Sequence, residues 1–218
     1  MKNQAIHAVI RILKQEIKQW RIPVVGIVAE RTRDPYRILI SCLLSLRTQD
    51  STTARASERL FRLAATPAAM IRLTPKRIER AIYPVGFYRT KAKTILHISR
   101  DLIQRYESRV PDDLDELLTL HGVGRKTANL VVTLGFGKPG ICVDTHVHRI
   151  SNRLGYVRTR TPDETETALR RKLPPRYWII LNDLLVTYGQ NLCKPISPLC
   201  SRCAISRYCD RVGVERSR

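Results

Sequence analysis

Four cysteines lie within residues 193–209 of the sequence, at Cys193, Cys200, Cys203 and Cys209. Their spacing is C-x6-C-x2-C-x5-C. Thiolates at this density hold a metal centre or form disulfides. Zinc sites favour cysteine pairs two to four residues apart, and only Cys200 and Cys203 form such a pair. The spacing alone therefore leaves zinc and an iron–sulfur cluster both open.

A second candidate for chemistry is the run LHGVGRK at residues 120–126. We predict a helix over residues 113–120, a tight glycine hairpin, and a second helix over residues 125–134. Glycine permits positive φ angles, and the amides that begin a helix attract an anion. A DNA phosphate would fit there without any contact to a base. An ordinary helix–turn–helix connection is the alternative, but the basic pair Arg125-Lys126 favours the phosphate site.

The charge of the chain points to the same partner. It has 39 Lys and Arg against 19 Asp and Glu, which gives a formal net charge of +20. The surplus is spread along the sequence, and a broad positive field suits a polyanion such as nucleic acid. A generally basic protein with many surface arginines is the less specific interpretation.

Neither a membrane span nor a signal peptide is predicted. No apolar stretch approaches the roughly 20 residues that cross a bilayer, and residues 1–16 mix charged with apolar side chains. We therefore expect a cytoplasmic, nucleoid-associated protein. Disulfides are rare there, which favours a metal for the four-cysteine segment. Cys42 and Cys142 lie in apolar surroundings and are expected to be buried core thiols.

The elements that must position these residues are predicted to be helices. Four dipeptides place a capping side chain before a proline at a helix start: Asp34-Pro35, Thr66-Pro67, Thr74-Pro75 and Thr161-Pro162. Thr161 and Glu164 also have the spacing of a capping box. Apolar residues recur at three and four, and alternation at period two is not sustained. We predict an all-α fold with a domain boundary in the glycine-rich loop at residues 135–140.

Three stretches carry a resemblance to a known family. Residues 120–129 (LHGVGRKTAN), residues 143–146 (VDTH) and the four-cysteine pattern resemble the endonuclease III family, within the helix-hairpin-helix superfamily of DNA glycosylases. The resemblance runs from about Ile22 to Cys209. It implies two helical domains that flank a DNA-binding cleft, with residues 22–133 as a helical barrel and residues 1–21 plus 134–218 as the cluster domain.

The resemblance also implies roles for two residues that would face each other across that cleft. Lys126 is the expected nucleophile and Asp144 the catalytic carboxylate. A carboxylate stabilises an oxocarbenium-like sugar, and an amine can attack C1′ to form a Schiff base that permits β-elimination. The alternatives are a phosphate-binding lysine and a helix-capping aspartate. In relatives that excise adenine or mismatched thymine, the position of Lys126 is typically not lysine, so Lys126 favours a bifunctional glycosylase and lyase.

The family also suggests which residues contact DNA. The hairpin residues Gly122, Val123, Gly124, Arg125 and Thr127 are expected to hold the backbone of the duplex. Lys194, Arg202 and Arg207 stand on the loops between the cysteines, and this placement is expected to suit contact with backbone phosphates.

Two further residues are candidates for wedges that fill the flipped-out gap, and both depart from the family. Arg47 stands where the family usually has glutamine, and Phe87 where leucine is frequent. Arginine can stack and donate hydrogen bonds, and an aromatic ring can insert between base pairs. A surface arginine and a core phenylalanine are the alternatives.

The resemblance resolves the choice of metal in favour of a [4Fe–4S] cluster on Cys193, Cys200, Cys203 and Cys209. We expect this cluster to be structural. The predicted function is excision of oxidised pyrimidines from double-stranded DNA by a monomer, followed by incision at the abasic site. A mismatch glycosylase and a non-catalytic iron–sulfur protein that binds DNA or senses redox state are the competing hypotheses.

Overall fold

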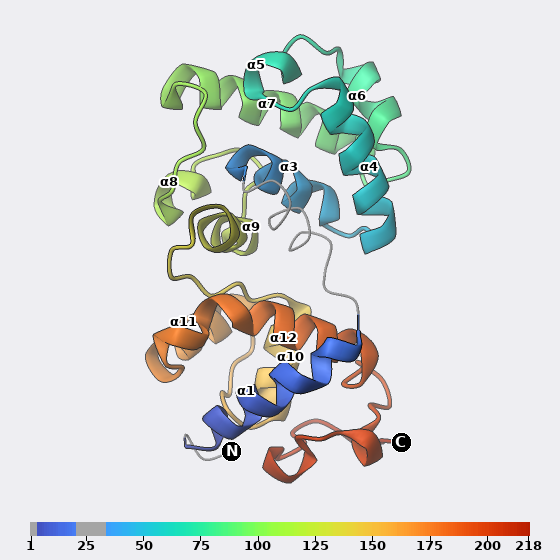
Figure 1. Ribbon diagram of the computed structural model, residues 1–218, viewed down its shortest axis with the longest axis vertical. Coiled ribbons are helices and arrows are strands. Elements are labelled where there is room, and N and C mark those ends of the chain that lie inside the picture. Colours follow the sequence, from blue (N-terminus) through green and yellow to red (C-terminus); the bar gives the residue numbers. More distant parts are fainter. Residues whose placement is uncertain (1–3, 21–33) are drawn as a thin grey trace. The chain divides into compact units, whose positions relative to one another are not determined.

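The protein is described by a computed structural model that covers residues 4–20 and 34–218 (Figure 1). Every regular element in these ranges is helical, so the all-α prediction is confirmed. The part of the predicted barrel at residues 22–33 lies outside the described residues, as do Arg21 and residues 1–3. No described helix has both the length and the apolar character needed to cross a membrane.

The chain divides into two compact units. The first is Val24–Lys138, and the second combines Met1–Pro23 with Pro139–Arg218. The helices of the first unit are α3 (Pro35–Ser45), α4 (Asp50–Leu63), α5 (Pro67–Met70), α6 (Pro75–Ile82), α7 (Tyr88–Tyr106), α8 (Leu114–Leu118), α9 (Arg125–Leu130) and the π-helical turn η2 (Val131–Gly135).

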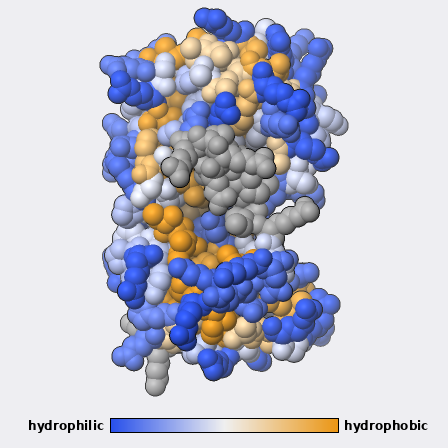
Figure 2. All heavy atoms as spheres, in the orientation of Figure 1, coloured by the Kyte–Doolittle hydropathy of each residue, from blue (hydrophilic) through white to orange (hydrophobic). Residues whose placement is uncertain are grey.

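The described part of the second unit, residues 4–20 and 139–218, contains four α-helices and several short 3₁₀ turns. They are α1 (Ala5–Glu16), η1 (Ile17–Gln19), α10 (Thr145–Arg153), α11 (Pro162–Lys172), η3 (Pro175–Tyr177), α12 (Trp178–Asn191), η4 (Cys200–Arg202) and η5 (Ser206–Tyr208). On the face drawn in Figure 2, hydrophilic side chains cover much of the surface, and hydrophobic side chains show between them.

The helix starts follow the capping signals in the sequence. The side chains of four predicted caps accept hydrogen bonds from first-turn amides: Asp34, Thr66, Thr74 and Thr161. The capping box differs in one detail. Glu164 Oε2 accepts from the amide of Arg160 at 2.8 Å, one residue before the cap, while Thr161 Oγ1 accepts from the Glu164 amide at 3.2 Å. Each cap satisfies amides that the helix itself leaves unbonded.

Helix α3 is the centre of the first unit. It packs against α4, α7, α9 and η2, and it is buried on all sides between Ile38 and Leu44. The hydroxyls of Tyr36 and Ser99, 2.7 Å apart, join α3 to α7 inside this core. A helix without a polar face needs neighbours all round, and α3 therefore forms a fixed base for the loops and the hairpin.

The core of the second unit lies between α1, α10, α11 and α12. Its buried side chains include Val9, Leu13, Ile150, Leu185 and Tyr188. The cysteine segment packs against the edge of this core, with Cys193, Cys203 and Cys209 only partly buried. The four-cysteine segment is thus supported by α10 and α12.

Candidate functional site

The glycine hairpin connects α8 to α9 as the sequence predicts. Gly122 has φ +80°, and a Cβ at this position would lie 2.9 Å from Thr94 Cγ2 of α7. Position 122 has a left-handed backbone and also lies close to the side chain of Thr94. Only glycine meets both conditions without strain. Gly124 caps α9 with φ −95°, and a Cβ there would meet no atom of residues 4–20 or 34–218 within 4 Å. The surface beside Gly124 is open to a ligand.

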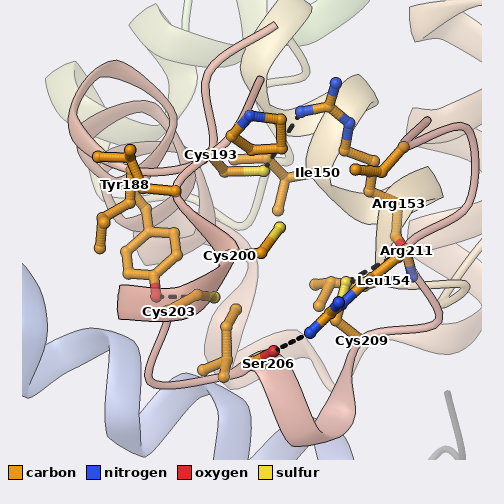
Figure 3. A pocket seen from close by; sticks show the side chains of 15 residues that line it. Ile150, Arg153, Leu154, Tyr188, Cys193, Cys200, Cys203, Ser206, Cys209 and Arg211 are labelled. Atoms are coloured by element: carbon orange, nitrogen blue, oxygen red, sulfur yellow. Dashed lines mark hydrogen bonds between the residues drawn. The ribbon is translucent and has the colours of Figure 1, made fainter. Parts of the chain in front are cut away.

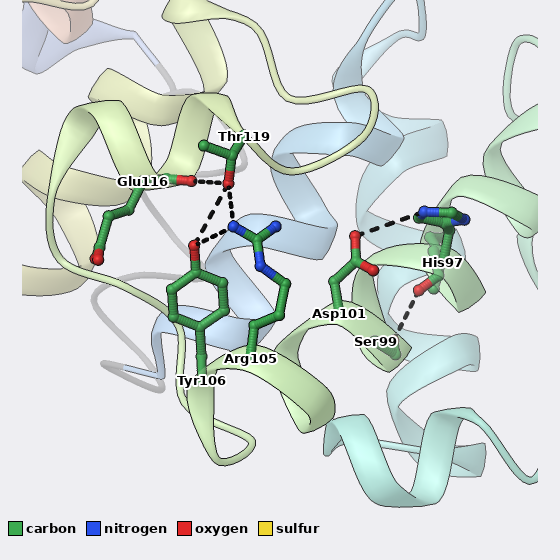
Figure 4. Close-up of polar contacts among 8 residues, drawn as sticks. His97, Ser99, Asp101, Arg105, Tyr106, Glu116 and Thr119 are labelled. Atoms are coloured by element: carbon green, nitrogen blue, oxygen red, sulfur yellow. Dashed lines mark hydrogen bonds and ion pairs between the residues drawn. The ribbon is translucent and has the colours of Figure 1, made fainter.

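Side chains of helix α7 contact the hairpin. The rings of His97 and His121 lie 5.3 Å apart. Further along, Arg105 Nη2 donates to the hydroxyl oxygen of Thr119 at 3.1 Å, with Tyr106 beside them (Figure 4). Both contacts hold the part of the hairpin that follows α8, at Thr119 and His121.

Lys126 is the second residue of α9. Its positive charge acts on the thiol of Cys42 in α3, whose pKa burial raises to about 12 and the lysine charge lowers. The side chain of Lys126 therefore lies near the buried C-terminal half of α3. Both Cys42 and Cys142 are core thiols, 1% and 2% exposed, as the sequence predicts.

The hairpin residues predicted to bind DNA fall into two groups. The side chains of Val123 and Thr127 are buried, at 7% and 2% exposure, so only their backbone could reach a phosphate. Arg125 and Lys126 are partly exposed. The helix that carries them departs from the expected α-helix over 125–134, because α9 ends at Leu130 and η2 continues as a π-helix. Thr133 donates to the carbonyl of Asn129, and such side-chain bonds compete with the regular ladder.

Asp144 begins α10 in the second unit. Its Oδ1 accepts from the amides of His146 and Val147 at 2.8 and 2.9 Å. The capping role proposed as an alternative is therefore real, and it fixes the orientation of the carboxylate. The three residues before Asp144, residues 141–143, are buried. Asn182 Nδ2 donates to the carbonyl of Cys142 at 3.2 Å. Asp144 is thus held from both sides.

Two arginines connect α10 to the cysteine segment. Arg149 Nη2 donates to the carbonyl of Cys193 at 2.8 Å, and burial lowers the pKa of this guanidinium. Arg153 donates to the carbonyls of Lys194 and Pro195, each at 2.6 Å. The helix that starts at Asp144 therefore supports the first cysteine loop.

The four predicted ligand cysteines line one pocket (Figure 3). Its other walls are largely apolar, including Ile150, Leu154 and Leu192. Among residues 4–20 and 34–218, no three His, Cys, Asp or Glu side chains form a group that would hold a single metal ion. No disulfide joins any of the described cysteines.

Hydrogen-bond donors surround the sulfurs. Tyr188 Oη donates to Cys203 Sγ at 3.2 Å, Arg153 Nη1 to Cys193 Sγ at 3.5 Å, and the Arg211 amide to Cys209 Sγ at 3.4 Å. Burial raises the pKa of the thiols of Cys203 and Cys209, and the neighbouring cysteines add to this rise. Four sulfurs in one apolar pocket with N–H and O–H donors fit the ligand set of an iron–sulfur cluster. Lys194, Arg202 and Arg207 are exposed on the loops between the ligands.

The predicted wedge residues lie together in the first unit. Arg47 and Phe87 both have left-handed backbones, with φ 52° and 57°, and the Arg47 guanidinium carbon lies 5.5 Å from the centroid of the Phe87 ring. Phe87 is 61% exposed and is not the core residue of the alternative hypothesis. Left-handed non-glycine residues are uncommon and mark positions that surrounding contacts determine.

Several supporting residues were not identified from the sequence: Lys91, Arg149, Arg153 and Tyr188. Arg149 and Arg153 stand four residues apart on α10, and Lys91 follows the Gly86-Phe87 turn. These spacings were the available signals, but each contact depends on a partner carbonyl or sulfur distant in sequence.

Comparisons with known proteins agree with this arrangement. Residues 40–175 match the family model for HhH-GPD superfamily base excision DNA repair proteins. The chain is 51% identical to endonuclease III of Thermotoga maritima over 81% of its length and 83% of that protein. It is 40% identical to endonuclease III homolog 1, chloroplastic, of Arabidopsis thaliana over 85% of its length, and spans 52% of that longer protein. A solved structure of a trapped covalent intermediate of an endonuclease III with DNA is similar at a TM-score of 0.86, with 34% identity and 97% of each chain covered.

Proposed function

Because the chain belongs to the HhH-GPD superfamily of base excision DNA repair proteins, and to its endonuclease III branch, we propose that it is a bifunctional DNA glycosylase and AP lyase. Its substrate is double-stranded DNA with an oxidised pyrimidine or an abasic site. The observation that carries this proposal is Lys126, an amine in the first turn of the helix that follows the glycine hairpin.

The reaction assigned to Lys126 proceeds through a covalent intermediate. Its Nζ lone pair forms a bond to C1′ while the bond from C1′ to the damaged base breaks, and the base leaves with that electron pair and takes up a proton. Opening of the sugar ring gives a protonated Schiff base. Loss of the C2′ proton then breaks the C3′–O bond, so the strand is cut by β-elimination. Water finally hydrolyses the imine and releases Lys126.

Asp144 has an electrostatic role in this scheme. Its carboxylate stabilises the positive charge that develops on the sugar as the base departs. The two amides on Oδ1 keep the carboxylate oriented, so little reorganisation is needed at the moment of reaction. The same aspartate is thus both a helix cap and a catalytic group.

The backbone of the hairpin and the cysteine loops supply the DNA contacts. The bare surface at Gly124 and the adjacent charge of Arg125 suit a phosphate, and exposed Lys194 suits a second one. These contacts do not read sequence, which matches an enzyme that must accept a lesion anywhere. The enzyme acts as a monomer on the chromosomal DNA.

The cofactor assigned to the cysteine pocket is a [4Fe–4S] cluster held by Cys193, Cys200, Cys203 and Cys209. The chemistry of the donor set supports it, because three of the four sulfurs receive a hydrogen bond within an apolar pocket. When bound, the cluster supplies a rigid cross-link between loops. The residues themselves keep the loop on α10 through Arg149 and Arg153.

A defined-lesion incision panel tests the proposal. Duplexes with thymine glycol, with an abasic site, with thymine opposite guanine, or without damage are incubated with the protein, and free base and nicked strand are measured separately. We expect base release and nicking on the first duplex and nicking on the second. Release of thymine from the mismatch without nicking would overturn the assignment.

A further inference from the structure

One buried cation has no role in the proposed chemistry. Lys91 lies in the first turn of α7 and is 9% exposed, although lysine side chains are seldom buried. A buried ammonium is costly unless its three N–H donors find acceptors. The contacts of Lys91 therefore indicate what it stabilises.

Among the described residues, the Lys91 ammonium donates three hydrogen bonds, and all of them go to the segment that contains Arg47. Its Nζ donates to the carbonyl of Leu44 at 2.9 Å, to the carbonyl of Leu46 at 2.5 Å and to Thr48 Oγ1 at 3.3 Å. Leu44 and Leu46 are at the C-terminal end of α3. A cation there satisfies the last carbonyls and interacts favourably with the helix dipole. The contacts lie on both sides of Arg47 in the sequence.

Thr48 extends this polar link to a second loop, residues 83–87, which connects α6 to α7. Its hydroxyl oxygen accepts from the amide of Gly86 at 3.1 Å and donates to the carbonyl of Leu46 at 3.2 Å. The two loops touch so closely that a Cβ on Gly86 would lie 2.6 Å from the carbonyl oxygen of Arg47. Phe87 is the next residue. Lys91 and Thr48 thus join the segment that presents Arg47 to the segment that presents Phe87.

The second loop is also held from its other side. Arg59 of α4 donates to the carbonyls of Ala81 and Tyr83 at 2.8 and 2.5 Å. Tyr83 and Tyr88 pack edge to face at 5.4 Å. The loop that carries the exposed Phe87 is therefore fixed by contacts on two sides.

A left-handed backbone costs a non-glycine residue about 1–2 kcal/mol, so two such residues side by side require support. We infer that Lys91 is a positioning residue that assembles Arg47 and Phe87, before DNA arrives, into one rigid two-part wedge for opening the duplex. This inference rests on the proposed function. A wedge ordered in advance avoids the entropic cost of ordering two loops on DNA. That saving matters because extrusion of a base costs a few kcal/mol.

The test compares Lys91→Met with Lys93→Met. Methionine keeps most of the length of lysine but donates no hydrogen bond. Lys93 is an exposed lysine on the same helix, so its variant controls for the loss of one charge. Thr48→Val breaks the same link at its other end and serves if Lys91→Met does not fold. Far-ultraviolet circular dichroism verifies the fold of each variant.

Two readouts separate wedge placement from general damage to the site. In the first, 2-aminopurine stands opposite a stable abasic analogue in duplex DNA, and its fluorescence is measured at saturating protein. In the second, nicking is measured at an abasic site in a fully paired duplex and at one in an open bubble, which needs no wedge. We expect Lys91→Met to lose most of the fluorescence rise and to nick the paired duplex about ten-fold more slowly, with less than about two-fold change on the bubble. Lys93→Met should match the wild type.

Equal losses on both DNA substrates would overturn the inference, because Lys91 would then support the whole site. An unchanged fluorescence rise in both Lys91→Met and Thr48→Val would overturn it as well. Failure of the proposed function has a different signature. The wild type would then nick neither substrate, while the fluorescence comparison would still report on the wedge.

Discussion

The guanidinium of Arg47 lies over the ring of Phe87, with 5.5 Å between the guanidinium carbon and the ring centroid. The two residues come from loops on opposite sides of α4–α6 in the sequence, and each has a left-handed backbone. A cation–π contact at an exposed site contributes about 0.5–1 kcal/mol, so the contact alone does not fix both loops. The pair is instead placed by the buried contacts beneath it.

Truncation of the exposed ring should affect DNA far more than folding. For Phe87→Ala we expect a change in unfolding free energy within about 0.5 kcal/mol, because the ring is 61% exposed. Excision from a paired duplex should fall by about ten-fold or more, because the wedge is lost. Leu63→Ala removes another exposed apolar side chain, 42% exposed, and is the matched control. Equal excision by both variants would contradict the assignment of Phe87.

The two hairpin glycines should respond differently to alanine. Gly122→Ala places a Cβ 2.9 Å from Thr94 Cγ2 at φ +80°, and we expect it to destabilise the fold by about 1–2 kcal/mol. The Cβ of Gly124→Ala meets no atom of the described part of the chain within 4 Å, so the stability of this variant should stay near wild type. Its methyl group should nevertheless weaken binding to DNA, because it occupies the side open to a phosphate. Urea unfolding and fluorescence anisotropy measure the two effects, and normal DNA binding by Gly124→Ala would argue against a phosphate at this turn.

Burial of Lys91 predicts a pH dependence of stability. Burial lowers the pKa of Lys91 in the folded protein from 10.5 to about 8. The unfolded chain therefore binds more protons between about pH 8 and pH 10.5, and this group favours folding increasingly as the pH rises through that window. The cost of burying the ammonium is present in full below pH 8. Relative to Lys91→Met, the unfolding free energy of the wild type should rise from pH 7.5 to pH 9.5, whereas parallel pH profiles would contradict a buried ammonium.

The sequence could predict most of the fold because its signals are local. Asp34, Thr66, Thr74 and Thr161 each cap a helix that begins at the following proline, and the hairpin glycines require a turn. The change from α9 to the π-helical turn η2 was not predictable, because no capping side chain marks it at Leu130. A capping hydroxyl, in contrast, can be recognised in the sequence because it stands directly before the helix that it caps.

The residues of the candidate site also fall into those that local sequence signals reveal and those that they do not. Lys126, Asp144 and the four cysteines stand in motifs and could be proposed from the sequence. Lys91 could not, because its acceptors lie more than 40 residues earlier, and the approach of two loops creates its environment. Its place shortly after the Gly86-Phe87 turn is the only signal in the sequence, and this spacing does not reveal the acceptors.

The cysteine pocket predicts a cofactor that can be measured directly. Cys203→Ser should abolish the broad visible absorption and the bound iron expected of the wild type, and it should loosen the segment between Cys193 and Cys209. Cys42→Ala removes a buried thiol outside this pocket and should leave both signals intact. A colourless wild type with bound zinc would refute the cluster.

Borohydride trapping tests the central claim most directly. The protein is mixed with duplex DNA that contains an abasic site or thymine glycol, sodium borohydride is added, and the products are separated under denaturing conditions. Reduction of the imine should link wild-type protein to DNA irreversibly, and Lys126→Ala should give no adduct while it still binds the same DNA. No adduct with the wild type, or an equal yield from Lys126→Ala, would contradict a Schiff base on Lys126.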